Sequence, residues 1–268
     1  MKHDFDIRVI SLNRAKKRRK EFKENNTDID FSFFDAVDGH KLTINDLTNT
    51  DYFVQPLPMR TKGAYGCALS HLALWQECIK TNKNLTIVED DVIFRKDFYN
   101  EASKVLSLAE DFDIILWGVN MDSVLSLDIM PKVTPAFLRF SESTFRKHIE
   151  NFKNETSKAY PYKLFWSLGI PAYTISPKGA KHYLEKCLPL KDFNHDVAIL
   201  DMEYFDREVI RLCCDNNYGI DVNMAVHYRT SKSYVSLPPL ALSPNIKNNS
   251  YIHPSNKNNI RPPFKVPI

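Results

Sequence analysis

The chain has 268 residues and a formal net charge of +3, and 43% of its residues are hydrophobic. These values predict a soluble globular protein with a sizeable core, and the charge is too small to indicate nucleic-acid binding. No window approaches the roughly 20 apolar residues that span a bilayer. The first residues, MKHDFDIRVISL, lack the apolar core of a signal peptide. We therefore expect a cytoplasmic protein.

Short apolar runs alternate with helical patterns along the first half of the chain. Strands are expected at 7–12, 30–34, 85–88 and 113–118, and helices after Asn13, over 66–80 and from Asp97. Strand–helix–strand order predicts an α/β fold whose mostly parallel sheet is covered on both faces.

The second half is expected to be irregular and more helical. GIPAYTISPKGAKHYL predicts a strand, a Ser-Pro helix start and a helix. Apolar residues at three- and four-residue steps predict a helix over 196–214, and SYVSLPPLAL predicts a last strand. The segment 245–268, rich in Asn, Pro and Lys, is expected to be an extended tail.

The cysteines are scattered and form no CxxC pair. This pattern indicates reduced, packing cysteines and not a disulfide or zinc framework. The five positions are Cys67, Cys78, Cys187, Cys213 and Cys214.

The stretch LTIVEDDVIF places three consecutive carboxylates at the end of an apolar run. Because side chains alternate along a strand, Glu89 and Asp91 should share one face while Asp90 takes the other. Open α/β sheets bind ligands at the carboxyl ends of their strands, and two carboxylates there suit Mg²⁺ or Mn²⁺. The alternative is a solvated strand end without a ligand.

A glycine-bearing loop leads into a helix in the stretch KGAYGCALSHLALWQ. Gly63 and Gly66 are two of only 7 glycines in the chain, which indicates a specific backbone demand. Helix N-termini favour phosphate groups. His71 is more typical of a packed histidine than of a catalytic one, and Ser70 has the alternative of bonding its own helix.

The run RAKKRRK, at 14–20, concentrates positive charge after the first strand. Such a run is usually a solvated helix face. The alternatives are binding of a phosphate-bearing ligand and contact with an anionic membrane surface.

Four stretches occur in an order and spacing that resemble glycosyltransferase family 25, which includes lipooligosaccharide galactosyltransferases of Gram-negative bacteria. They are VISLNRAKKRRKEF, FFDAVDG, GAYGCALSHLALWQ and LTIVEDDVIF. Two later segments, GIPAYTISPKGAKHYL and GIDVNMAVHYRTSKSYVSLPPLAL, are more loosely similar to the family. The resemblance covers roughly residues 7–245.

The resemblance implies a GT-A-like fold, a single Rossmann-type domain over 1–244. Its donor-binding part would be about 1–120 and its acceptor part about 121–244, followed by the tail. It also implies a metal-dependent motif at Glu89-Asp90-Asp91, with Mn²⁺ or Mg²⁺ as the cofactor and a UDP-sugar as the donor.

Site roles follow from the same resemblance. Asp91 and Glu89 would coordinate the metal ion, with His227 as a further ligand. Asp221, in GIDVNM, would be the catalytic base, although Gly219 stands where the family has proline. Asp196 is the second candidate base, and helix capping is the alternative role for both aspartates.

The implied donor pocket is formed by residues from all four N-terminal stretches. Its members would be Ser11, Leu12, Asn13, Arg18, Asp38, Gly39, Ser70, His71, Glu89 and Asp90. The chain departs from the family pattern at two positions, with Ser11 in place of asparagine and Ala64 in place of glutamate.

The resemblance therefore predicts an inverting hexosyltransferase that moves galactose from UDP-galactose to a lipooligosaccharide or other surface glycan. A lipid-linked acceptor would bring it to the inner face of the inner membrane. The alternatives are a UDP-glucose or UDP-N-acetylhexosamine donor, a Mg²⁺-dependent nucleotidyltransferase or phosphohydrolase, and a non-catalytic carbohydrate- or calcium-binding module.

Overall fold

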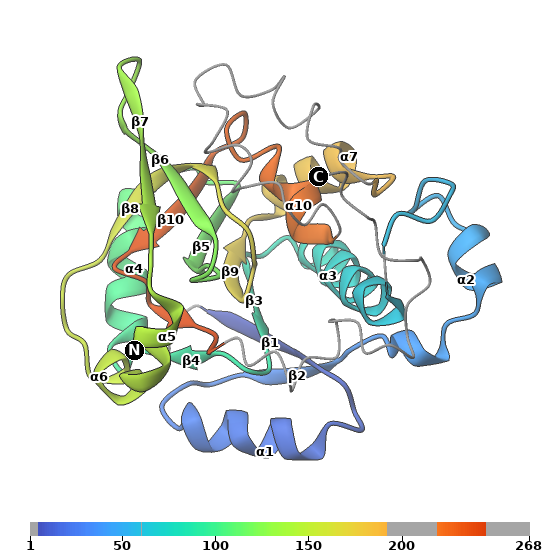
Figure 1. The fold of residues 1–268 in the computed structure, drawn as a ribbon, viewed down its shortest axis with the longest axis horizontal. Coiled ribbons are helices and arrows are strands. Elements are labelled where there is room, and N and C mark those ends of the chain that lie inside the picture. The colour runs from blue at the N-terminus through green and yellow to red at the C-terminus, as the bar shows by residue number, and fades with distance from the viewer. Residues whose placement is uncertain (1–4, 60, 192–218, 245–268) are drawn as a thin grey trace, which may run out of the picture.

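A nine-stranded sheet forms the centre of the molecule in the computed structural model, which describes residues 5–59, 61–191 and 219–244 (Figure 1). The strand order is β2-β1-β3-β9-β5-β10-β8-β6-β7. The bounds are β1 (Asp6–Ser11), β2 (Ser32–Asp35), β3 (Leu85–Glu89), β5 (Ile114–Gly118), β6 (Val124–Met130), β7 (Thr134–Arg139), β8 (Tyr160–Trp166), β9 (Ala172–Ile175) and β10 (Ser233–Leu237).

The sheet is mixed, with most strands pointing the same way. The pairings give β1, β2, β3, β5, β6 and β10 one direction, and β7, β8 and β9 the opposite one. β9 lies between β3 and β5 and is antiparallel to both. A short second sheet pairs β4 (Ile93–Phe94) with β11 (Ala241–Leu242). The α/β class and the mostly parallel sheet are thus confirmed.

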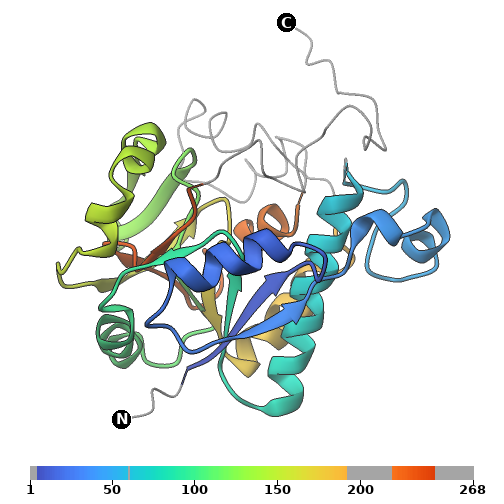
Figure 2. The same ribbon diagram turned by 90° about the horizontal axis from the view of Figure 1, so that it is seen from below.

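Helices cover both faces of the sheet (Figure 2). They are α1 (Lys16–Asn25), α2 (Ile44–Thr48), α3 (Lys62–Thr81), α4 (Phe98–Leu108), α5 (Glu142–Lys147), α6 (Ile149–Lys153), α7 (Pro177–Cys187) and α10 (Ile220–Ala225), with a 3₁₀ turn η1 (Gly39–Lys41). α3, α7 and α10 share one hydrophobic core, and α1 and α4 share the other.

Strand alternation sends neighbouring side chains to opposite cores. In β5, Leu116 belongs to the core under α3 and α7, whereas Trp117 belongs to the core under α1 and α4. Ile87 and Val88 of β3 divide in the same way. This explains why both strands read as continuous apolar runs, since neither face meets water.

The second half contains more strand than its sequence pattern indicated. β6 and β7 form a hairpin that extends beyond the rest of the sheet (Figure 1), and β8 pairs with β6 and β10. β7 is the last strand of the sheet order and several of its side chains face solvent, so its apolar pattern is weak. The expected helix over 196–214 and the tail 245–268 lie outside the described residues.

The loop between β2 and η1 packs directly on α3, and Gly39 and Gly66 make this approach possible. A Cβ on Gly66 would lie 2.4 Å from the Val37 carbonyl oxygen, and one on Gly39 would lie 1.9 Å from the Lys62 carbonyl oxygen. Ser70 closes the contact, because its hydroxyl accepts from Val37 N at 2.9 Å and donates to the Gly66 carbonyl at 2.7 Å. The backbone demand expected at Gly66 is therefore one of packing.

We expect Gly66→Ala to lower the free energy of unfolding by about 1–3 kcal/mol, as overpacking does in other buried sites. Helix propensity alone would favour alanine. A loss of stability would therefore come from the close approach between Gly66 and the Val37 carbonyl. Urea unfolding measures the change, with Lys80→Ala at an exposed position of α3 as the control. Unchanged or increased stability of Gly66→Ala would contradict the packing role.

Candidate functional site

The candidate site lies where the carboxyl ends of β1 and β3 meet. The two strands are parallel neighbours, and Ile10 is in register with Glu89. Ser11 ends β1, while Glu89 ends β3 and is followed directly by Asp90 and Asp91. The sheet therefore brings together Ser11 and the three acids that the sequence placed in one pocket.

Asp90 is the acid that the protein itself neutralises. Its Oδ2 accepts from Ser11 Oγ at 2.6 Å, and its Oδ1 lies 2.5 Å from a guanidinium nitrogen of Arg18. Burial raises the pKa of Asp90, and the Arg18 charge and the Ser11 hydrogen bond oppose that rise. Asp90 thus fixes the start of α1 to the end of β3.

Asp91 is less well satisfied than Asp90. The Arg18 guanidinium lies 3.5 Å from its Oδ2. Its Oδ1 is buried and has no hydrogen-bond partner among the described residues. A buried carboxylate oxygen without a donor is costly, and a cation is one way to compensate it.

Glu89 holds its proton unusually tightly. Burial, together with the nearby Asp91 carboxylate, raises the pKa of Glu89 to about 8, and Asp90 and Asp221 add to the rise while Arg18 opposes it. Three carboxylates therefore face a single guanidinium. Glu89 and Asp91 form an oxygen-rich pair suited to a hard divalent ion, so the residues present fit Mn²⁺ or Mg²⁺.

Asp221 lies in the first turn of α10, beside the same acids. Its Oδ2 accepts from the Gly169 backbone N–H at 3.0 Å. Burial raises the pKa of Asp221, and its charge in turn raises the pKa values of Glu89 and Cys67. The N-cap of α10 is Gly219, so Asp221 does not cap the helix.

Gly219 leaves room for that carboxylate. Its φ of 144° falls in the region that favours glycine, and a Cβ there would lie 2.4 Å from Asp221 Oδ1. A side chain at position 219 would therefore clash with the Asp221 carboxylate, which gives a steric reason for glycine where the family has proline.

One face of α3 closes the site behind Glu89. Cys67 and His71 lie one helical turn apart, and ligand atoms of Cys67, His71 and Glu89 lie within 4.8 Å of one another. His71 is fully buried, with Nδ1 2.8 Å from the Tyr173 hydroxyl. Burial lowers the pKa of His71 to about 3, so the imidazole is neutral.

The other predicted donor-pocket residues lie around the ends of β1 and β2. Asp38 accepts from Arg14 Nε at 2.7 Å, and this hydrogen bond lowers the pKa of Asp38. Asn13 pairs with Asp35 and Lys16. The Leu12 carbonyl accepts from Ala15 N. Gly39 and Ser70 serve the contact between the loop and α3 described above.

The basic run has two kinds of members. Arg18 and Arg19 are partly buried, and Arg19 Nη2 donates to the Ser11 carbonyl at 2.7 Å as well as pairing with Asp35. Lys16, Lys17 and Lys20 are exposed. Arg18 pairs with the acids that follow β3, Arg19 holds the end of β1, and the lysines form a solvated face.

One predicted site residue, His227, is not brought to the acids. The charged groups that act on His227 are His182, Lys191 and Lys186, and burial is the main cause that lowers its pKa. The cation-binding group found among the described residues does not include His227. Asp196 lies outside the described residues.

Some site residues were not predicted from the sequence. Cys67 was interpreted as a packing residue, although its four-residue spacing from His71 was a usable signal. Tyr173 and Gly169 act through contacts between segments that are distant in sequence. No local pattern marks such contacts.

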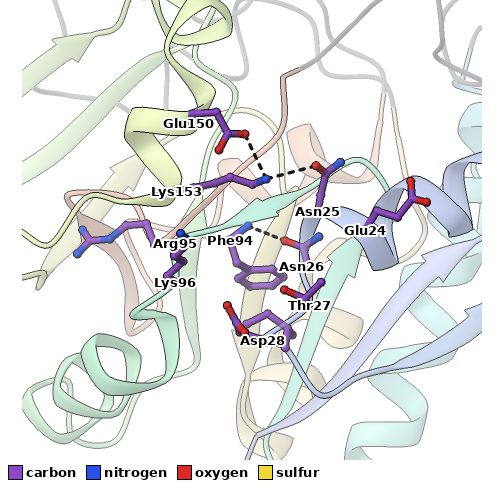
Figure 3. A pocket seen from close by; sticks show the side chains of 11 residues that line it. Glu24, Asn25, Asn26, Thr27, Asp28, Phe94, Arg95, Lys96, Glu150 and Lys153 are labelled. Carbon is purple, nitrogen blue, oxygen red and sulfur yellow. Dashed lines mark hydrogen bonds and ion pairs between the residues drawn. The ribbon is translucent and has the colours of Figure 1, made fainter.

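A separate pocket of about 200 Å³ lies near the C-terminal end of α1 (Figure 3). Lys153 Nζ lies 3.3 Å from Glu150 Oε1 and 3.4 Å from Asn25 Oδ1. None of the three consecutive acids lines this pocket, and its volume is below the roughly 300 Å³ at which small-molecule sites begin. It is not the site of the acids.

Comparison with known proteins gives a family match. The model of "Glycosyltransferase family 25 (LPS biosynthesis protein)" matches residues 5–199. The chain is 29% identical over 204 residues to a Haemophilus influenzae protein, with 74% of this chain and 62% of that one covered. It is 29% identical over 228 residues to procollagen galactosyltransferase 2 of Mus musculus, covering 76% of this chain and 33% of that one.

A third relative, a glycosyltransferase 25 family member of Aedes aegypti, is 28% identical over 193 residues, covering 67% of this chain and 28% of that one. The chain thus spans from under a third to about six-tenths of the length of these relatives. Among solved structures, a mannose-1-phosphate geranyltransferase of Thermus thermophilus is similar over 90% of this chain and 74% of that one, with a TM-score of 0.40 and 13% identity. No helix in the described ranges is long and apolar enough to cross a membrane.

The raised pKa of Glu89 predicts a pH-dependent stability when no divalent ion is bound. The unfolded chain ionises Glu89 near 4.5 and the folded chain near 8. The folded state therefore binds this proton more tightly, and the resulting stability is lost as pH rises through about 8. We expect Glu89→Gln to reduce the fall in unfolding free energy between about pH 5 and 8.

Urea unfolding in the presence of a chelator measures that slope, with the exposed Glu110→Gln as the matched control. A wild-type slope in Glu89→Gln would show that Glu89 is not protonated in the folded chain.

Proposed function

Because the chain belongs to glycosyltransferase family 25, we propose that it is a metal-dependent, inverting glycosyltransferase that uses a UDP-sugar donor. The observation that carries this proposal is the meeting of Ser11, Arg18 and three carboxylates at the carboxyl ends of β1 and β3. Open α/β sheets bind nucleotides at this position.

Glu89 and Asp91 are the proposed ligands of Mn²⁺ or Mg²⁺. Asp91 Oδ1 has no partner among the described residues, and Glu89 is the acid whose pKa the nearby Asp91 carboxylate raises. When bound, such an ion supplies charge stabilisation for the diphosphate leaving group. Arg18, which compensates Asp90 and reaches Asp91, is the proposed contact of the diphosphate.

Asp221 is the proposed general base. In an inverting displacement, a base must take the proton from the acceptor hydroxyl as the new bond forms. Burial raises the pKa of Asp221, which strengthens it as a base, while the Gly169 N–H holds one carboxylate oxygen. Asp196 stays the second candidate.

Galactose is the proposed donor sugar, supported by the similarity to a protein named procollagen galactosyltransferase 2. A surface glycan is the proposed acceptor, supported by the family's description as an LPS biosynthesis protein. The exposed lysines of α1 offer a surface for peripheral contact with anionic lipid around such an acceptor. A screen of UDP-galactose, UDP-glucose and UDP-N-acetylhexosamines for metal-dependent hydrolysis decides among the donors.

We expect UDP to raise the melting temperature only when Mn²⁺ or Mg²⁺ is present, because ligand binding to the folded state stabilises it by mass action. Asp91→Asn should abolish this metal dependence, since it removes one anionic ligand. Thermal unfolding with UDP, metal and both together makes the measurement, and Asp51→Asn at an exposed position is the control. Unchanged UDP/Mn²⁺ stabilisation in Asp91→Asn would refute the metal assignment.

We expect Asp221→Asn to bind the donor normally and to lose about 10²–10⁴-fold in transfer, the usual contribution of a general base. Asparagine keeps an oxygen that can accept from Gly169, so the fold should be preserved. Donor affinity and turnover with a glycoside acceptor are measured in parallel, again against Asp51→Asn. Retained turnover would move the base to Asp196 or to another residue.

A further inference from the structure

Cys67 and His71 present two metal-binding atom types on one face of α3. They stand at positions i and i+4, so a single helical turn places their side chains side by side. The end of β3 supplies a third group, because ligand atoms of Cys67, His71 and Glu89 lie within 4.8 Å of one another. This cluster has no part in the transfer chemistry proposed above except through Glu89.

His71 gives independent evidence that a ligand is accommodated here. The side chain is fully buried, yet its Nε2 has no hydrogen-bond partner among the described residues. Its other nitrogen, Nδ1, is 2.8 Å from the Tyr173 hydroxyl. The ring nitrogen left to bind a ligand is therefore Nε2.

Tyr173 fixes the orientation of this imidazole. Its hydroxyl oxygen accepts from Trp75 Nε1 at 2.9 Å and keeps a second lone pair that can accept from His71 Nδ1–H. Metal-binding histidines characteristically donate their other N–H to an oxygen of a carboxylate, carbonyl or water, which sets the tautomer and the ring plane. The Tyr173 hydroxyl can orient His71 in the same way.

The atom types select the class of ion. A thiolate sulfur, an imidazole nitrogen and one carboxylate oxygen suit Zn²⁺ and similar thiophilic ions, whereas Mg²⁺ and Mn²⁺ prefer oxygen ligands. Tetrahedral zinc sites place their ligand atoms about 3.5 Å apart, so atoms that lie within 4.8 Å of one another have to approach by about 1 Å at most. Cys67 and Glu89 are both partly exposed, which gives the ion a route of entry.

We propose that Cys67, His71 and Glu89 form a binding site for a thiophilic divalent cation of the Zn²⁺ class, separate from the Asp91 side of the donor site. A solvent molecule would complete the coordination, as in three-ligand zinc sites. The proposal does not rest on the proposed glycosyl transfer, because it needs neither nucleotide nor acceptor.

Titration with Co²⁺ tests the proposal, since Co²⁺ accepts the same ligands and a bound thiolate gives it a charge-transfer band in the near ultraviolet. The experiment uses the full chain without nucleotide, in a Cys213→Ser/Cys214→Ser background that removes the adjacent cysteine pair. We expect one saturable equivalent of Co²⁺ with the thiolate band, and displacement of the Co²⁺ by Zn²⁺.

The variants assign the band to residues. Cys67→Ser should abolish it, and Tyr173→Phe should weaken Co²⁺ binding about 10–100-fold, as loss of an orienting partner does in other sites. Cys78→Ser, at a buried thiol that contacts the Lys83 carbonyl, should leave the band unchanged. Asp91→Asn should also retain it, which separates this site from the donor metal.

A measurement on the unsubstituted chain does not depend on whether the variants fold. Zn²⁺ should slow alkylation of Cys67 by at least about tenfold, as followed by peptide mass mapping. The absence of a saturable thiolate band, its persistence in Cys67→Ser, or an unchanged alkylation rate of Cys67 would each overturn the proposal.

Discussion

The accumulation of three carboxylates at the end of a buried strand is the constraint around which this molecule is built. Ionised acids so close together repel one another, and burial makes that repulsion worse. The three acids are compensated to different degrees. Arg18 and Ser11 compensate Asp90, Arg18 partly compensates Asp91, and Glu89 has its pKa raised to about 8. Because Arg18 comes from α1 and Ser11 from β1, the arrangement of the first βα unit depends on the acids that it neutralises.

The second constraint is the packing of α3 against the loop after β2 and the end of β3. At its N-terminal end, Gly66 and Ser70 hold the loop after β2, while Cys67 and His71 face the end of β3. The contact with the loop after β2 and two members of the cluster around Glu89 therefore belong to one helix. Glu89 lies close to both Asp91 and Cys67, and its raised pKa has burial as the main cause, followed by the Asp91 carboxylate.

Sequence periodicity predicted best the elements whose side chains are mostly buried. β1, β3 and β5 are buried on both faces, and each is found close to its predicted bounds. α3 was predicted to begin at Gly66 after a loop, but it begins at Lys62, capped by Thr61, and contains both Gly63 and Gly66. The hairpin of β6 and β7 and the strand β8 were not predicted, because half-exposed strands mix polar and apolar residues. In the site, the acids, Ser11 and Arg18 were predicted from local stretches, whereas the Gly169 contact and the Tyr173 support for His71 arise between segments far apart in sequence.

The position of β9 between β3 and β5 has a consequence for how the molecule forms. Thr86 and Thr174 share a buried hydrogen bond across 88 residues of chain, so the centre of the sheet joins segments that are distant in sequence. Closing a loop of that length lowers the chain entropy before the contacts of β9 can form and offset the loss. Non-local pairing of this kind therefore slows folding. During synthesis, β1, β2 and β3 can pair early, but Tyr173 and Gly169 reach them only after most of the chain has been made. The site therefore gains its support for His71 and Asp221 only after β1, β2 and β3 can already have paired.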